Sequence, residues 1–202
     1  LGVIRSHTDM SLAVRGLLGA DERGRMVYVY THCPDDAAPV RGYGVKTRNP
    51  QGMQPRFLMR GKKCALWGAD DAAARDAVWI TEGESDALAV RAAVEDWHEI
   101  ALHTLDKYDP STFPAVVAKP DAGTFKEEWA RPLRGKEVTL IIDADVAGLD
   151  GAKKTAGILK AAGVRRVFAW MPSGVKDARA AFKAGMPHLL ANDIYSKRKL
   201  LD

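Results

Sequence analysis

The chain has 202 residues, of which 47% are apolar, so it can bury a sizeable core as one large domain or two small ones. Its two cysteines, Cys33 and Cys64, lack paired spacing, which argues against a disulfide scaffold or a zinc site and favours a reducing cytoplasm. No apolar run approaches the roughly 20 residues that span a bilayer, and the net charge of +4 mildly favours a polyanionic partner.

The first 76 residues have the pattern of a small basic α+β subdomain. A short helix is expected near residues 11–18, followed by β-like runs at 26–31, 40–47, 57–59 and 65–67 that Gly-, Pro- and Asn-rich turns separate. These runs predict a small antiparallel sheet. Residues 41–63 contain seven basic side chains and no acidic one: Arg41, Lys46, Arg48, Arg56, Arg60, Lys62 and Lys63. Such a segment can hold phosphates, although an ordinary solvated surface has the same composition.

From residue 77 onward apolar strands alternate with helices. Strands are expected at 77–80, 115–118, 138–142 and 167–171, and helices at 85–97, around 152–163 and at 177–184, with Gly185 as a stop. Each strand is apolar on both faces, which predicts a Rossmann-like parallel sheet with helices on both sides. We therefore place an α/β domain at residues 77–190 and a basic, solubilising tail at residues 191–202.

Acidic side chains follow three of these strands. Glu82, Glu84 and Asp86 follow the first, Asp143 and Asp145 follow the third, and Asp177 follows the last. The carboxyl ends of parallel strands form one crevice, so these side chains should converge. Two carboxylates about 5 Å apart repel by roughly 3 kcal/mol at an effective dielectric near 20. A cation or raised pKa values must offset this repulsion, and magnesium prefers oxygen ligands.

The alternative is that these acids cap helices and interact with helix dipoles. We favour that alternative for Glu84 and Asp150, and the metal site for the Asp143–Asp145 pair, because capping needs one acidic group rather than two. Gly83 and Gly148 fit positions where the backbone turns tightly or approaches a ligand. The five histidines show no ligand spacing, and we interpret them as structural.

Two of these acidic segments resemble the motifs of the Toprim family. Residues 80–88 (ITEGESDAL) are similar to an apolar strand that ends in EGxxDxL, and residues 143–148 (DADVAG) are similar to DxDxAG. Between them, residues 122–124 (AGT) stand where Toprim primases carry a Gly-Thr or Gly-rich loop.

Other segments resemble primases within that family. Residues 42–48 (GYGVKTR), 56–58 (RFL) and 66–68 (LWG) are similar to the basic subdomain of bacterial and phage primases, and residues 172–177 (PSGVKD) to the segment that leads to Lys-Asp. The Thr-Glu-Gly-Glu-x-Asp version most resembles the primase half of phage primase–helicases. Bacterial primases usually carry a further acid where this chain has Arg179, so Asp177 stands alone as a ligand from this segment.

The resemblance implies a DNA primase core that makes short RNA primers on single-stranded DNA from ribonucleoside triphosphates by metal-dependent nucleotidyl transfer. Mg²⁺ or Mn²⁺ would be bound by Asp143 and Asp145, with Asp177 as a further ligand and Glu82 as ligand or general base. Asp86, Gly83 and Gly148 would support this site. Template or triphosphate phosphates would be held by five basic residues: Lys46, Arg48, Arg56, Lys62 and Lys63.

Partners are implied as well. The chain starts at Leu1 rather than at Met, and the sequence contains neither a zinc-binding nor a helicase module, so we expect a fragment or a core that works with both in cis or in trans. Two other functions stay open: a Toprim nuclease with the same acids, and a non-catalytic single-stranded-DNA-binding module. A topoisomerase is disfavoured because its clamp and catalytic tyrosine need a longer chain.

Overall fold

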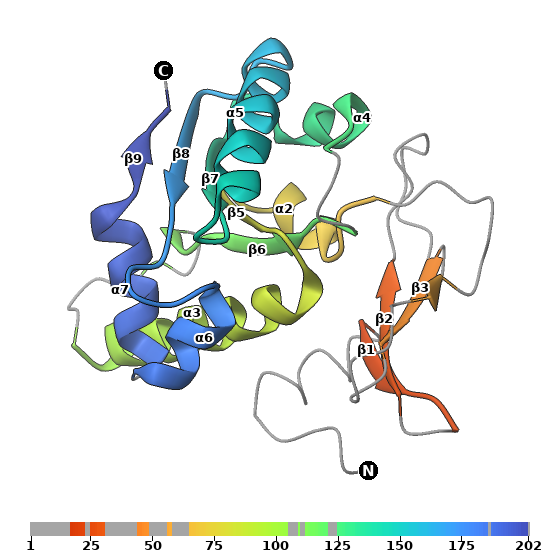
Figure 1. Ribbon diagram of the computed structural model, residues 1–202. Helices are drawn as coiled ribbons and strands as arrows, with labels where there is room; N and C mark the ends of the chain where they lie inside the picture. Colours follow the sequence, from red (N-terminus) through yellow and green to blue (C-terminus); the bar gives the residue numbers. More distant parts are fainter. Residues whose placement is uncertain are drawn as a thin grey trace.

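The computed structural model describes residues 17–22, 25–30, 44–48, 56–57, 65–104, 109, 112–120, 125–185 and 187–201, without the side chains of residues 44, 48, 56–57 and 187–188. These residues form a small sheet and a larger sheet with its helices (Figure 1). Among them, no helix is both long and apolar enough to cross a membrane.

The small sheet is antiparallel, as predicted. Its order is β1 (Leu18–Ala20), β2 (Met26–Tyr30), β3 (Gly44–Arg48) and β4 (Arg56–Phe57). The helix expected near residues 11–18 does not reach its predicted end, because Leu18 pairs with Tyr28 in β1; residues 11–16 lie outside the described part. The run at 65–67 is not a strand of either sheet, since Trp67 makes an isolated bridge with Ala118.

The larger sheet is mostly parallel. Its strands are β5 (Ala77–Thr81), β6 (Ala115–Ala118), β7 (Glu137–Ile141), β8 (Arg166–Trp170) and β9 (Lys199–Leu200), in the order β6-β5-β7-β8-β9. The first four run parallel, as the sequence predicts, and β9 adds an antiparallel edge. The helices are α2 (Ala69–Ala73), α3 (Glu84–Thr104), α4 (Glu127–Ala130), the short 3₁₀ helix η2 (Arg131–Leu133), α5 (Val146–Ala161), α6 (Ala178–Ala184) and α7 (Pro187–Lys197).

Helices cover both faces of this sheet, and the alternation of strand side chains explains why. In β5, Val78 and Ile80 pack with α2, α4, η2 and α5, whereas Trp79 packs with α3 and α7 on the other face. Figure 1 shows α3, α6 and α7 together on one side and α5 on the opposite side. Tyr28 and Tyr30 of the small sheet join the core on the α3 side, so the two sheets share one hydrophobic core.

The C-terminal segment is not a solubilising tail. Residues 187–197 form α7, whose Leu190, Ala191 and Ile194 are buried against α3, and Lys199 pairs with Ala169 across the β8–β9 edge. Arg198 forms an ion pair with Glu137 at 2.7 Å. The apolar spacing of 190, 191 and 194 suits one helical face, and burial of that face outweighs the basic run that follows it.

Candidate active site

The topology brings the ends of β5 and β7 together. The chain leaves β5 towards β6 on one side, returns across β5 to β7, and continues to β8 on the other side. In open α/β sheets the ligand crevice lies where the strand order reverses in this way. Glu82 follows β5 and Asp143 follows β7 by two residues, so both stand at the mouth of that crevice.

Glu82 and Asp143 are in direct contact. The backbone N–H of Asp143 donates to Oε1 of Glu82 at 3.4 Å, near the long limit for a hydrogen bond. Gly148, in the first turn of α5, permits this approach: a Cβ at this position would lie 2.6 Å from the carbonyl oxygen of Asp143 and 3.2 Å from Oε1 of Glu82. At Gly83 a Cβ would meet Asp86 only at the ordinary distance of 3.7 Å, so Gly83 shows no comparable constraint.

The carboxyl group of Asp143 lies in a strongly acidic setting. Burial, and after it the negative charges of Glu82, Asp86 and Asp177, raise its pKa from the ordinary 3.8 to about 6, while Lys176 opposes the rise. The loops after β7 and β8 are joined by the bond from the Ala144 N–H to the Lys176 carbonyl, 2.8 Å. Acids from two other segments, one after β5 and one after β8, therefore act on the Asp143 carboxyl group.

Asp145 and Asp177 each cap a helix. Asp145 accepts from the N–H of Gly148 at 2.7 Å at the start of α5, and Asp177 accepts from the N–H of Ala180 at 2.7 Å at the start of α6. Both backbones are extended at the cap, as N-cap residues usually are. From the spacing of Asp143 and Asp145 we expected metal binding rather than capping. The structure shows that Asp145 caps as well.

Asp86 and Arg179 join α3 to α6. Oδ1 of Asp86 accepts from the backbone N–H of Arg179 at 3.2 Å, and the Arg179 guanidinium lies 3.7 Å from Oδ2 of Asp177. Arg179 is about half exposed, so this ion pair contributes little to stability. The basic residue thus lies beside Asp177, at the position where bacterial primases usually carry a further acid.

The donor set suits a hard divalent cation in its chemistry. It consists of carboxylate oxygens. The pKa of Asp143 is raised by burial and then by its acidic neighbours, and a cation would offset both effects. In the conformation described, however, no three Asp, Glu, His or Cys side chains among the described residues are arranged around one point.

Glu84 lies apart from this cluster. Its side chain is 1% exposed and points to the small sheet, where the Tyr30 hydroxyl donates to it and Lys46 Nζ lies 2.7 Å from Oε1. Lys46 also donates to the carbonyl of Pro120, after β6. The ammonium group that we expected to hold phosphates is therefore engaged inside the protein. The register pairs Lys46 with the buried Tyr28, so both side chains lie on the same, inward face of the small sheet.

The other predicted phosphate contacts are only partly placed. Arg48 lies at the end of β3 and Arg56 at the start of β4, on neighbouring strands, but their side chains are outside the described part. Lys62 and Lys63 lie entirely outside it, as do residues 122–124 of the Gly-Thr loop.

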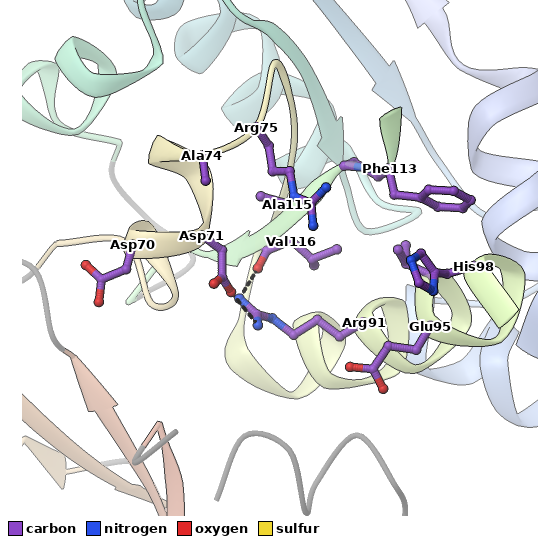
Figure 2. Close-up of a pocket in the computed structure, with 12 residues that line it drawn as sticks. Asp70, Asp71, Ala74, Arg75, Arg91, Glu95, His98, Phe113, Ala115 and Val116 are labelled. Atoms are coloured by element: carbon purple, nitrogen blue, oxygen red, sulfur yellow. Dashed lines mark hydrogen bonds and ion pairs between the residues drawn. The ribbon is translucent and has the colours of Figure 1, made fainter. Parts of the chain in front are cut away.

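A separate pocket of about 340 Å³ lies between α2, α3 and the start of β6, towards the amino ends of the strands (Figure 2). Arg91 reaches into it from α3, forms an ion pair with Asp71 at 2.8 Å and donates to the Val116 carbonyl. None of the clustered acids lines this pocket. Its buried arginine is used to hold α2, α3 and β6 together.

The family model for Toprim-like proteins matches residues 79–182, which include Glu82, the Asp143–Asp145 segment and Asp177. No curated protein sequence matches the chain significantly.

Solved structures match almost the whole chain. A DNA primase domain from Pseudomonas aeruginosa is 17% identical with a TM-score of 0.58, covering 95% of this chain and 59% of that one. The RNA polymerase domain of Mycobacterium tuberculosis primase DnaG is 18% identical with a TM-score of 0.56, covering 94% and 62%. This chain thus spans about three fifths of the length of these bacterial domains.

A phage complex matches over more of its own length. The structure of bacteriophage T7 lagging-strand DNA polymerase interacting with primase domains of two gp4 subunits, bound to an RNA/DNA hybrid and dTTP, contains a chain that is 19% identical with a TM-score of 0.60. The match covers 93% of this chain and 86% of that one. Likeness at these identities establishes the fold, and the small sheet is included in it.

Proposed function

This chain belongs to the Toprim-like family, and we propose that it is the catalytic core of a DNA primase that makes short RNA primers on single-stranded DNA. The observation that carries the proposal is the pairing of the Toprim unit with the small antiparallel sheet. Primase domain structures match 93% and 95% of the chain, a span that includes both parts. A Toprim unit alone, which also serves nucleases, would not favour primase in this way.

The proposed chemistry uses the acidic cluster at the ends of β5, β7 and β8. Asp143, Asp145, Asp177 and Glu82 would hold Mg²⁺ or Mn²⁺. The metal ion would neutralise the negative charge of the triphosphate and the charge that develops on the attacking 3′-oxygen. Glu82 would be either a further ligand or the general base for the hydroxyl, and a bound cation would lower the raised pKa of Asp143 and keep its carboxylate ionised. Gly148 keeps the backbone of Asp143 against the Glu82 carboxylate, and Asp86 holds α6 beside it.

The same proposal assigns phosphate-binding residues and partners. Arg48, Arg56, Lys62 and Lys63 would hold template or triphosphate phosphates. Lys46 is left out of that set because its ammonium is taken up by Glu84. We propose a cytoplasmic site of action and a zinc-binding module and a replicative helicase as partners, joined to the chain or separate.

The decisive experiment is extension of a short oligoribonucleotide annealed to a DNA template, with labelled ribonucleotides and Mg²⁺ or Mn²⁺. A preformed primer removes any need for template-sequence recognition by a missing module. We expect extension by the wild-type chain, none by Asp143→Asn or Glu82→Gln, and normal extension by Asp96→Asn. Asp96 is an exposed acid on α3, ten residues or roughly 15 Å along the helix from Asp86.

Two results would replace the proposal. Metal-dependent degradation of single-stranded DNA without ribonucleotide incorporation would assign the same acids to a nuclease. Binding of single-stranded DNA with neither activity, even with the partner modules supplied, would indicate a non-catalytic binding module.

A further inference from the structure

A buried polar network joins the small sheet to the start of α3. The Tyr30 hydroxyl of β2 and the Lys46 ammonium of β3 both donate to the Glu84 carboxylate, at 2.8 Å from Lys46 Nζ to Oε2. Lys46 donates a further bond to the Pro120 carbonyl, two residues beyond β6. Tyr30 is 0%, Glu84 1% and Lys46 5% exposed, so the network is closed to solvent.

The network spans three parts of the protein. Tyr30 and Lys46 belong to adjacent strands of the small sheet, Glu84 is the first residue of α3, and Pro120 belongs to the loop that leaves the β6 edge of the large sheet. Glu84 lies two residues after Glu82, which contacts the Asp143 backbone. The carboxylate edge and the small sheet are therefore joined through one turn of chain.

We infer that Glu84, Lys46 and Tyr30 form a positioning device, which fixes the small sheet relative to the carboxylate edge so that template and triphosphate meet the acids in a single geometry. The inference rests on the proposed function for its catalytic readout. Glu84 acts through its partners and is not one of the acids proposed to bind metal, because its carboxylate is occupied by Tyr30 and Lys46.

The physical basis is that buried charges tolerate few arrangements. A carboxylate and an ammonium removed from water must stay paired and hydrogen-bonded, so the parts that carry them cannot slide without breaking the pair. Apolar packing alone allows more such sliding, since it has no direction. Catalysis of a transfer reaction is sensitive to such sliding of one sheet relative to the other, because a misplacement of about 1 Å can lower the rate by about 100-fold.

The test compares Lys46→Met, which keeps length but removes charge, with Glu84→Gln and the conservative Lys46→Arg. Tyr30→Phe, which removes only the hydroxyl, is a milder variant that keeps the buried ring. Each is assayed about 15 °C below its own Tm, so that unfolding does not contribute. We expect kcat for primer extension to fall at least tenfold in Lys46→Met and Glu84→Gln and severalfold in Tyr30→Phe. Mn²⁺ affinity should stay within about threefold, and Lys46→Arg should retain most of the activity.

A matched control is Arg198→Met. Arg198 and Glu137 form another ion pair with little exposure, 12% and 10%, but at the amino ends of the strands and within the larger unit. This variant should lose thermal stability and keep its kcat. A reduction of kcat equal to that of Lys46→Met would mean that any buried ion pair has the same effect, and would overturn the positioning role.

A distance measurement decides the question without activity. Spin labels at exposed Ala20 of β1 and Lys153 of α5, with Cys33 and Cys64 replaced by serine, should give one narrow distance distribution in the otherwise wild-type chain. Lys46→Met should broaden it and Arg198→Met should not. An unchanged distribution in Lys46→Met overturns the inference, as does a broadened one with full kcat. A wild-type chain that extends no primer refutes the proposed function, and the distance distribution still decides whether the network holds the two sheets in place.

Discussion

Replacing Asp143 by asparagine should stabilise the metal-free protein at neutral pH. The carboxyl group has its pKa raised from 3.8 to about 6 by burial and by Glu82, Asp86 and Asp177. Folding therefore opposes ionisation of this carboxyl group. At about 1.4 kcal/mol for each pKa unit, the gain in the free energy of unfolding of Asp143→Asn has an upper limit of about 3 kcal/mol. Asp143 is partly exposed, so solvent screening reduces the expected gain to about 1–2 kcal/mol.

The pH dependence gives this prediction its sign. Below pH 3.8 the carboxyl group is neutral in both the folded and the unfolded chain, and the variant and wild type should unfold alike. Between pH 3.8 and about 6 the unfolded chain ionises first, so the wild type loses stability relative to Asp143→Asn as the pH rises. Above that range the difference should be constant.

The assay is urea denaturation in EDTA from pH 3.5 to 8, with Asp96→Asn as a control for loss of an exposed acid. A difference between Asp143→Asn and wild type that does not change with pH would refute the reasoning. Adding Mg²⁺ should then stabilise the wild type more than the variant, because the cation binds the folded carboxylates.

Three further predictions concern the α5 cap, the glycine beside Asp143 and two basic residues of the first 76. Asp145→Ala should abolish primer extension and destabilise the fold by about 1 kcal/mol through loss of the α5 cap, whereas Asp145→Asn should abolish extension with the stability kept in denaturation. Gly148→Ala should destabilise by about 1–3 kcal/mol, because its Cβ would meet the Asp143 carbonyl at 2.6 Å; Gly151→Ala, with nothing within 4 Å, should not. Replacing Lys62 and Lys63 by alanine should flatten the slope of log affinity against log salt on single-stranded DNA by about one to one and a half; an unaltered slope would exclude them as phosphate contacts.

The sequence predicted the larger sheet well because its signal is simple. Four runs of apolar residues, each bounded by turn or helix signals, correspond to β5, β6, β7 and β8 within one residue at each end. The strand order of the sheet and the antiparallel edge strand β9 were not predicted. A two-residue edge strand such as Lys199–Leu200 has no periodicity, and its pairing depends on α7 bringing it back to β8.

The sequence predicted that the acids after β5, β7 and β8 lie near one another, as they do, but not how the side chains of Asp145 and Glu84 point. Placement after a strand identified Glu82, Asp143 and Asp177, because strand ends in a parallel sheet share one edge. Capping was set aside for Asp145, yet the N–H of Gly148 three residues later is the usual partner of an N-cap carboxylate. Sequence spacing permits both roles for such a residue, and only the side-chain rotamer in the fold distinguishes them.

The acids of residues 82–86 show why neighbouring carboxylates in one motif are not interchangeable. In a strand, Glu82, Glu84 and Asp86 would all face one way, because alternate residues share a face. Here β5 ends at Thr81 and α3 begins at Glu84. Because a helix turns by about 100° per residue, the side chains of Glu84 and Asp86 point about 200° apart around the helix axis. Glu82 consequently contacts the Asp143 N–H, Glu84 the small sheet and Asp86 the Arg179 N–H. Each acid has a different partner, so loss of one cannot be compensated by the next, and Glu82→Gln and Glu84→Gln should fail for different reasons. The first should weaken Mn²⁺ binding, and the second should leave it intact.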